Sequence, residues 1–176
     1  MWAIIGILPA VQSEFGAGRA DASLPYTLTM LGFALGNFLI GQAVDSFGVA
    51  LSLVLAALGI AAGFGLAMIS GSILALSLAQ LLIGLCSAVG FGPLIAEISH
   101  WFLRRRGIAV ALVASGNYLS GALWSYALVD MLAEAGWRAV YCFLAVLTLV
   151  VVIPFALLLR AQVPEAAKDA AQADVD

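Results

Sequence analysis

Three polar side chains that lie within apolar stretches of the sequence could hydrogen-bond a solute: Gln80, Asn117 and Trp124. Asn117 and Trp124 are seven residues apart, so on a helix they share one face, with Gly121 between them. An amide offers donors and an acceptor, and an indole offers one N–H donor. The two amides could instead bond between helices, which any polar partner satisfies. We therefore take the three as candidate solute-binding residues and keep helix-to-helix bonding open as the alternative.

Two charged motifs are candidates for gating or for anchoring in the membrane rather than for binding a solute. Gly41 and Gly48 bracket Asp45 where one apolar stretch ends and the next begins. The carboxylate of Asp45 could accept backbone N–H groups at the start of the next helix, as an N-cap does, or it could be a solvated helix end. We expect a gating role for this joint. The second motif, Arg104, Arg105 and Arg106, is expected to anchor the topology and to contact anionic lipid.

Enzymatic chemistry is not expected. His100 is the single histidine, and the two cysteines, Cys86 and Cys142, lie inside apolar stretches. No spacing of these residues matches a metal site, and no catalytic constellation accompanies them. The sequence therefore predicts no metal and no other cofactor, and no nucleic acid is expected as a partner.

The elements that must position these residues are apolar stretches of about 20 residues, the length that crosses the ~30 Å hydrocarbon core of a bilayer. The sequence is 64% hydrophobic and only 10% charged, whereas a soluble domain has roughly a quarter of its residues charged. The apolar runs do not alternate with polar residues, which favours helices over barrel strands. We predict an all-α, polytopic membrane helical bundle. The stretches without a charged side chain are residues 24–43, 51–69, 73–96, 108–129 and 139–159.

The two ends of the sequence differ from these five spans. Residues 1–11 are apolar but cover only about half of a membrane, so we expect a truncated first span; a start codon assigned too late is the alternative. Residues 1–160 are then one transmembrane domain. Residues 161–176 are expected to form a polar, acidic tail.

Topology follows from the cations in the connections. Arg104, Arg105, Arg106, Arg160 and Lys168 belong to one side of the predicted bundle, and Arg19 and Arg138 belong to the other. Because Lys and Arg accumulate on the cytoplasmic side of a membrane, the arginine loop and the C-terminus are expected in the cytoplasm.

Small residues at a spacing of four predict where helices touch. They occur as Gly32 with Gly36, Gly59 with Gly63, Gly84 with Ala88, and Gly116 with Ser120. Lipid gives helices no hydrophobic drive to associate, so such strips indicate close packing. Trp137 and Tyr141, at the start of the last span, are expected in the aromatic belt of the membrane interface.

Several motifs together resemble one family of transporters. The joint GQAVDSFG, from Gly41 to Gly48, is similar to the loop between helices two and three of the major facilitator superfamily (MFS), although Ser46, Val49 and Ala50 stand where the family has basic residues. The motifs RRRG before ASGNYLSG, GWR before the last span, and SEFGAGRADASLPYT resemble its monocarboxylate and oxalate:formate antiporter-like branch. The chain resembles the N-terminal six-helix half of such a transporter.

The resemblance implies a solute held between two six-helix halves near the midplane of the membrane. Gln80 stands four residues before Gly84, where the family often carries an arginine implicated in proton coupling. No predicted span contains an ionisable Asp, Glu, Lys, Arg or His side chain, so proton carriage is not expected within them.

The expected function is transport of a small solute, with an organic anion as the candidate. The alternative is a non-transporting membrane fragment, or an accessory bundle that binds a partner. The expected partners are the lipid bilayer, the solute, and a complementary six-helix half or a second copy of the chain. The expected location is the cell membrane, as in the inner membrane of a bacterium.

Overall fold

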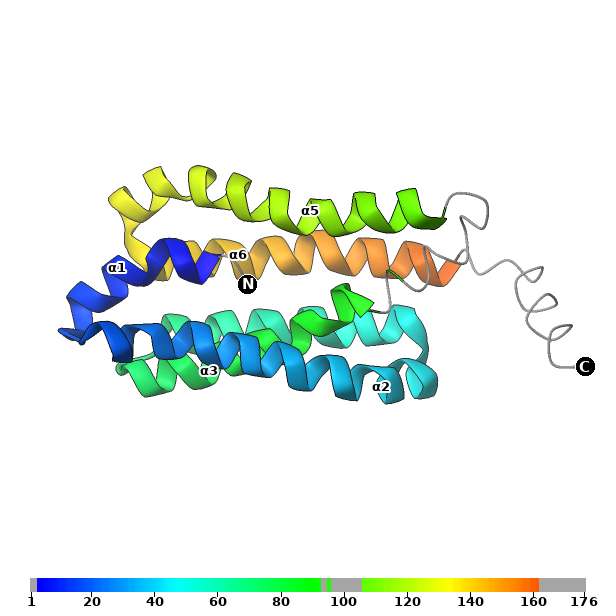
Figure 1. Cartoon of the computed structure of the whole chain (residues 1–176), viewed down its shortest axis with the longest axis horizontal. Coiled ribbons are helices and arrows are strands. Elements are labelled where there is room, and N and C mark those ends of the chain that lie inside the picture. Colours follow the sequence, from blue (N-terminus) through cyan, green and yellow to red (C-terminus); the bar gives the residue numbers. More distant parts are fainter. Residues whose placement is uncertain (1–2, 93–94, 96–105, 162–176) are drawn as a thin grey trace, which may run out of the picture.

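The computed structural model describes residues 3–92, 95 and 106–161, and these residues form helices and short connections (Figure 1). The all-α fold class is therefore confirmed. The helices run roughly parallel to the long axis of the molecule. Their bounds are α1 (Ala3–Phe15), α2 (Arg19–Met68), α3 (Ile73–Ser87), the 3₁₀ turn η1 (Ala88–Gly90), α5 (Arg106–Ala127) and α6 (Val129–Ala161).

Two of the long helices are each broken at a glycine. In α2 the backbone of Gly48 has φ 77° and ψ 163°, and in α6 that of Gly136 has φ 76° and ψ 169°. This backbone region is open essentially to glycine alone. At Gly48 the chain reverses, so that residues 19–47 and 49–68 form two segments of α2 lying alongside α3 (Figure 1). The predicted joint is thus a sharp turn that requires Gly48.

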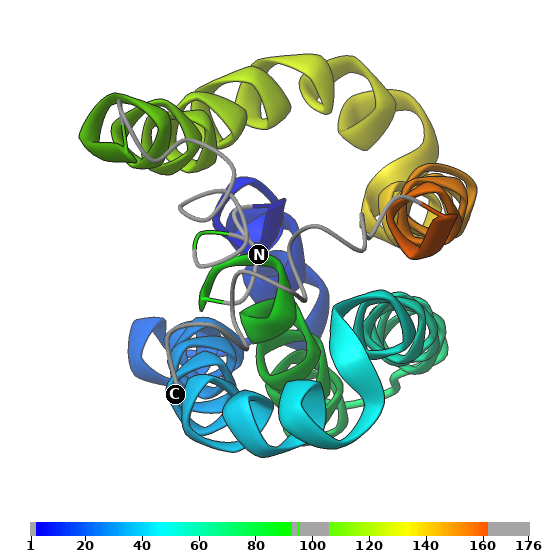
Figure 2. The ribbon, with the colours of Figure 1, turned by 90° about the vertical axis from the view of Figure 1, so that its right-hand side faces the viewer.

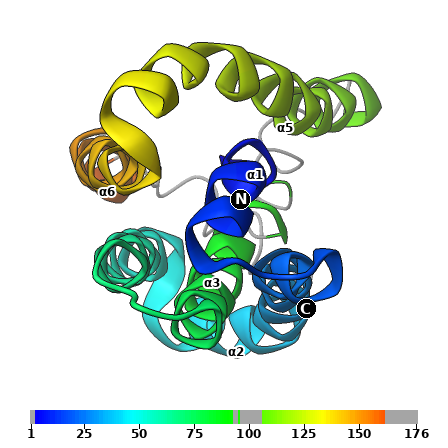
Figure 3. The ribbon, with the colours of Figure 1, turned by 90° about the vertical axis from the view of Figure 1, so that its left-hand side faces the viewer.

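Helix α3 lies between the two segments of α2 in backbone contact with the first of them (Figures 2 and 3). A Cβ atom on Gly84 would lie only 2.1 Å from the carbonyl oxygen of Thr29, and one on Gly32 would lie 2.2 Å from that of Leu81. On the other side, a Cβ on Gly63 would lie 2.5 Å from Cγ1 of Ile83. The predicted small-residue contacts of α2 and α3 are confirmed. In α5, by contrast, a Cβ on Gly116 would meet nothing within 4 Å.

The connections alternate between the two ends of the bundle. Figure 1 shows the α1–α2 link, the α2–α3 link and the Gly136 turn at one end. The Gly48 turn, η1 and the first residues of α5 lie at the other end. This is the up-and-down order that alternate membrane crossings require.

The interior and the outer surface are both apolar. One buried cluster joins Ile4, Ile7 and Val11 of α1 to residues of α3 and α6, among them Ile83 and Tyr141. On the outside, large side chains such as Phe38, 80% exposed, remain uncovered. Four helices of the described ranges are long and apolar enough to cross a membrane, by length and composition. They are Ala20–Met68, Ile73–Gly90, Gly107–Trp124 and Val129–Leu158, while α1 is shorter.

Three details differ from the sequence expectations. Regular α-helix in α3 ends at Ser87 rather than continuing to residue 96, and η1 follows. Trp137 and Tyr141 are 3% and 0% exposed, so they belong to the core and not to a belt at the membrane interface. After the Gly136 turn, the ring of Trp137 packs against Phe15 of α1 and the ring of Tyr141 packs against Phe64 of α2.

The glycine contacts yield a stability prediction. Gly84→Ala should lower the free energy of unfolding by about 2 kcal/mol, because its methyl group would overlap the backbone oxygen of Thr29 and push the helices apart. Gly65→Ala is the matched control, because a Cβ there meets nothing within 4 Å; the gain in helix propensity should make it neutral or slightly stabilising. Thermal unfolding in detergent measures both, and equal melting temperatures for the two variants would contradict the contact.

Candidate functional site

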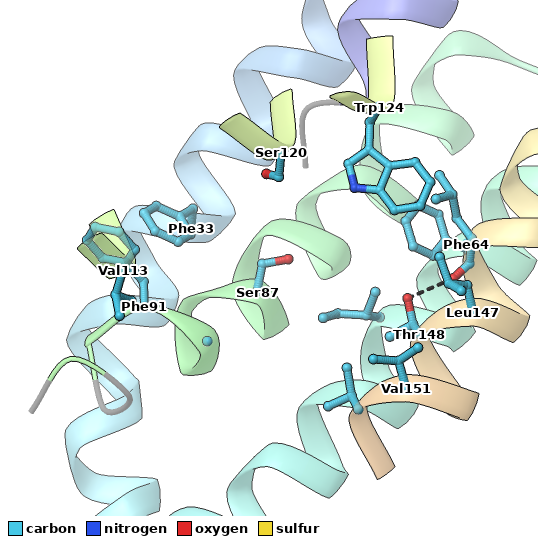
Figure 4. Close-up of a pocket in the computed structure, with 14 residues that line it drawn as sticks. Phe33, Phe64, Ser87, Phe91, Val113, Ser120, Trp124, Leu147, Thr148 and Val151 are labelled. Carbon is cyan, nitrogen blue, oxygen red and sulfur yellow. Dashed lines mark hydrogen bonds between the residues drawn. The ribbon is translucent and has the colours of Figure 1, made fainter. Parts of the chain in front are cut away.

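A pocket of about 710 Å³ opens between the α2–α3 side of the bundle and the α5–α6 side (Figure 4). Its volume is within the range of small-molecule sites. The lining residues come from α2, from α3 and the η1 region, and from α5 and α6. They are Phe33, Ile60, Phe64, Ser87, Gly90, Phe91, Val113, Ser120, Trp124, Leu144, Leu147, Thr148, Val151 and Val152.

Aromatic contacts hold the walls of this pocket in place. The rings of Phe33 and Phe91 meet edge to face with centroids 6.1 Å apart. Trp124 packs in the same way against Phe143, at 6.4 Å, which ties α5 to α6. These geometries are the favoured ones for aromatic pairs. The pocket is therefore bounded by paired, oriented rings from several helices.

The polar groups of the pocket are few and uncharged. The hydroxyl of Ser87 donates to the carbonyl oxygen of Ile83 at 2.7 Å. The hydroxyl of Thr148 donates to the carbonyl oxygen of Leu144 at 2.7 Å (Figure 4). Each hydroxyl has then used its one proton and keeps only acceptor capacity. No side chain among the fourteen that line the pocket carries a charge.

Of the three residues proposed from the sequence to face a solute, Trp124 and Gln80 do not lie together. Trp124 lines the pocket, whereas Gln80 does not and is buried in the core, 2% exposed. Asn117 belongs to α5, but its side chain lies outside the described part of the structure. Reasoning from the sequence missed Ser87 and Thr148, because hydroxyl residues are common in membrane helices and carry no spacing signal of their own.

Gln80 is the centre of a buried polar cluster that joins three helices. The hydroxyl of Thr29, on α2, has two acceptors in reach of its one proton, the Pro25 carbonyl oxygen at 2.8 Å and Oε1 of Gln80 at 3.1 Å. The Nε2 amide of Gln80 in turn donates to the hydroxyl of Tyr141, on α6. One α3 turn earlier, the hydroxyl of Ser77 is buried and has no hydrogen-bond partner among the described residues. The amide therefore bonds between helices, which is the alternative kept open above.

A second polar cluster closes one end of the bundle. Arg138, just after the Gly136 turn, donates from Nη1 to Glu14 Oε1 at 2.6 Å, from Nε to the Met68 carbonyl oxygen at 3.1 Å, and from Nη2 to the Ser70 carbonyl oxygen at 3.3 Å. The indole N–H of Trp137 donates to the other oxygen of Glu14. The bonds from Trp137 and Arg138 hold the pKa of the Glu14 carboxyl below its usual value. We call these contacts the Arg138 clamp.

The Gly41–Gly48 joint differs from its predicted geometry. Asp45 is exposed and lies within the first segment of α2, and it is Gly48 whose backbone departs from the helix. The expectation that Asp45 caps the following helix is therefore wrong, because a capping residue must itself leave the helical conformation. Gly41 is exposed and has free space around it. Of the arginine trio, Arg104 and Arg105 lie outside the described residues, and only the backbone of Arg106 is described, as the first residue of α5.

Comparison with known proteins identifies the family of this bundle. A family profile described as Major Facilitator Superfamily matches residues 1–175. The chain belongs to the Major Facilitator Superfamily. With the long apolar helices of the structure, this membership makes it a multi-pass membrane protein that contacts the lipid bilayer.

Individual MFS relatives agree with this assignment. A protein of Aspergillus niger named MFS-type transporter pynF is 30% identical over 154 residues, which is 85% of this chain and 35% of the relative. The Hexuronate transporter of Bacillus subtilis is 27% identical over 81% of this chain and 34% of its own length. The human Monocarboxylate transporter 11 is 39% identical over 39% of this chain and 15% of its own length. The chain spans about a third of the length of the first two of these curated relatives.

The Gln80 cluster leads to a prediction about coupling between α3 and α6. Gln80→Met keeps the length of the side chain but leaves the Tyr141 hydroxyl unpartnered, so the free energy of unfolding should fall by about 1 kcal/mol. Tyr141→Phe should have a similar cost for the converse reason. In the double variant the second change should add little, since no unpaired group remains between the two side chains. Fully additive losses in melting experiments would show that the two residues do not stabilise the bundle together.

Proposed function

We propose that these helices form the N-terminal six-helix half of an MFS secondary transporter that moves a small solute across a membrane. The observation that carries this proposal is the pocket between the α2–α3 side and the α5–α6 side, in a chain of this family. In such transporters the solute binds near the midplane and the two halves rock around it. The proposed activity is transport without chemical conversion of the solute.

The other wall of the site would come from a complementary six-helix half or from a second copy of the chain. Exposed apolar side chains along α5, among them Leu112, Leu119 and Tyr126, supply a surface for such a partner or for lipid. Three relatives are named for organic anions, as a hexuronate transporter, a probable sulfoacetate transporter and a monocarboxylate transporter, and these names support a small organic anion without selecting one.

Trp124 is the residue that we propose contacts the solute directly, and Asn117 is proposed to line the same face of α5 further along. Gln80 is proposed to position α3 rather than to touch the solute. The joint of Gly41, Asp45 and Gly48 is proposed as a gating element, because the chain reverses there at the end of the bundle. Arg104, Arg105 and Arg106 are proposed to anchor that same end.

The proposed location is the cell membrane, which in a bacterium is the inner membrane, with the C-terminus in the cytoplasm. The excess of Lys and Arg in the residue 97–107 connection and the tail supports this orientation. Arg138 lies at the opposite end of the bundle, where the sequence carries fewer cations.

Orientation can be measured with a pair of cysteines at opposite ends. In a background in which Cys86 and Cys142 are replaced by alanine, Gly71→Cys should react with a membrane-impermeant thiol reagent in intact cells, and Gly107→Cys should react only after permeabilisation. Both glycines have open space where a side chain would start. The reverse labelling pattern would place the arginine loop outside.

Transport can be measured as solute exchange in vesicles from cells that express the chain. Exchange of a small organic solute should be lost in Trp124→Ala and retained in the control Phe155→Ala, whose ring is 64% exposed on α6 and does not line the pocket. An imposed pH gradient should not drive accumulation, because the predicted spans contain no ionisable Asp, Glu, Lys, Arg or His side chain. If a broad panel of solutes gave no exchange, a second copy of the chain would not complete the site; no exchange after co-expression with a complementary six-helix half as well would make the chain a non-transporting bundle.

A further inference from the structure

Ser77 differs from most hydroxyl side chains of these helices. Most of those that the structure describes donate to a carbonyl oxygen three or four residues earlier in their own helix, as Ser87 and Thr148 do. The hydroxyl of Ser77 is 0% exposed and has no hydrogen-bond partner within the described ranges. Burial of an unpartnered hydroxyl is costly, and in proteins such groups are usually satisfied by ordered water.

The amide of Gln80 lies next to this hydroxyl. Gln80 follows Ser77 by three residues, so the two side chains share one face of α3, with Cβ atoms about 5–6 Å apart. One N–H of the amide donates to the Tyr141 hydroxyl, and the described residues provide no acceptor for the other. Both side chains are buried, so neither lipid nor another chain can reach these donors. Their partner must lie inside the bundle.

Three protons at this place have no acceptor in the described part of the chain. They belong to the Ser77 hydroxyl, to the second N–H of Gln80, and to the Tyr141 hydroxyl, whose oxygen accepts the first N–H. A cation would be repelled by these donors, so a ligand here must be neutral and must accept hydrogen bonds. It must also fit between side chains one helix turn apart. A water molecule meets these conditions, with about 2.8 Å to each donor.

From this arrangement we infer that Ser77 and Gln80 bind one internal water molecule. The water accepts a hydrogen bond from each side chain, and it donates its own protons to helix carbonyl oxygens, which keep a second lone pair. With its second N–H held by the water, the Gln80 amide keeps its first N–H directed at Tyr141. The water is thus a structural part of the joint between α3 and α6. The inference is independent of the proposed transport function.

Crystallography tests the site directly. Crystals of the full chain grown in a lipid mesophase, at a resolution that shows ordered waters, should have a density peak within about 3.2 Å of both the Ser77 oxygen and the Gln80 amide nitrogen. With both side chains ordered, the absence of this peak would overturn the inference. A Ser77 hydroxyl that instead donates to the Ile73 carbonyl oxygen, four residues earlier, would overturn it as well.

Thermal unfolding in lipid nanodiscs gives an independent measurement. Ser77→Ala removes one of the bonds that hold the water, whereas the matched control Ser87→Ala removes a hydroxyl that bonds to the backbone of the same helix. Both changes gain the same helix propensity, so the difference between the two variants reports on the hydroxyl groups. Ser77→Ala should melt about 3 °C below Ser87→Ala.

The other outcomes of the melting experiment contradict the water. Equal melting temperatures would show that Ser77 makes no bond beyond its own helix. A higher melting temperature for Ser77→Ala would show a hydroxyl that is buried without any partner. Stabilisation by sodium chloride relative to choline chloride at equal concentration, lost in Ser77→Ala, would identify a cation in place of water. Each of these results would overturn the inference.

Discussion

The contact between the backbones of α2 and α3 at Gly84 is the constraint on which the rest of this structure depends. Gly84 of α3 lies against the carbonyl oxygen of Thr29 on α2, and Gly32 of α2 lies against that of Leu81 on α3. At both glycines the helices are so close that a Cβ atom would overlap the facing carbonyl oxygen. In a membrane such contact is a main source of cohesion, since lipid competes equally for apolar side chains. The approach also fixes the rotation of α3, and that rotation sends Gln80 toward Thr29 and Tyr141 while Ser87 faces the pocket.

The polar groups of the bundle are divided between two tasks. Those of the core, Gln80, Thr29 and Tyr141, contact one another and join three helices, while the buried hydroxyl of Ser77 has no partner among the described residues. Those of the pocket, Ser87 and Thr148, are satisfied within their own helices and leave lone pairs at the surface of the pocket. Because an unsatisfied polar group in an apolar setting is costly, bonding these hydroxyls within their own helices lets them line an apolar pocket.

Much of the fold could be predicted from the sequence because a membrane confines charged residues to the connections and leaves long uncharged runs as the spans. The all-α class, the glycine contacts of α2 and α3 and the turn at the Gly41–Gly48 joint followed from uncharged runs and small residues. The pairing of Gln80 with Tyr141 and of Glu14 with Arg138 could not, since their partners are 61 and 124 residues apart and other polar residues were equally available. The predicted capping role of Asp45 was wrong because a carboxylate between glycines suggests a helix cap, whereas Asp45 is still within the helix and the chain turns at Gly48.

The Arg138 clamp has a consequence for how the bundle is made. A chain emerges from the ribosome N-terminus first, so Glu14 and the carbonyl groups of Met68 and Ser70 exist long before the arginine that joins them. Until α6 is made, the ends of α1, α2 and α3 have no common cation to draw them together. Closure of this end therefore follows synthesis of residue 138, and a ribosome stalled before that residue would leave α1, α2 and α3 without these bonds.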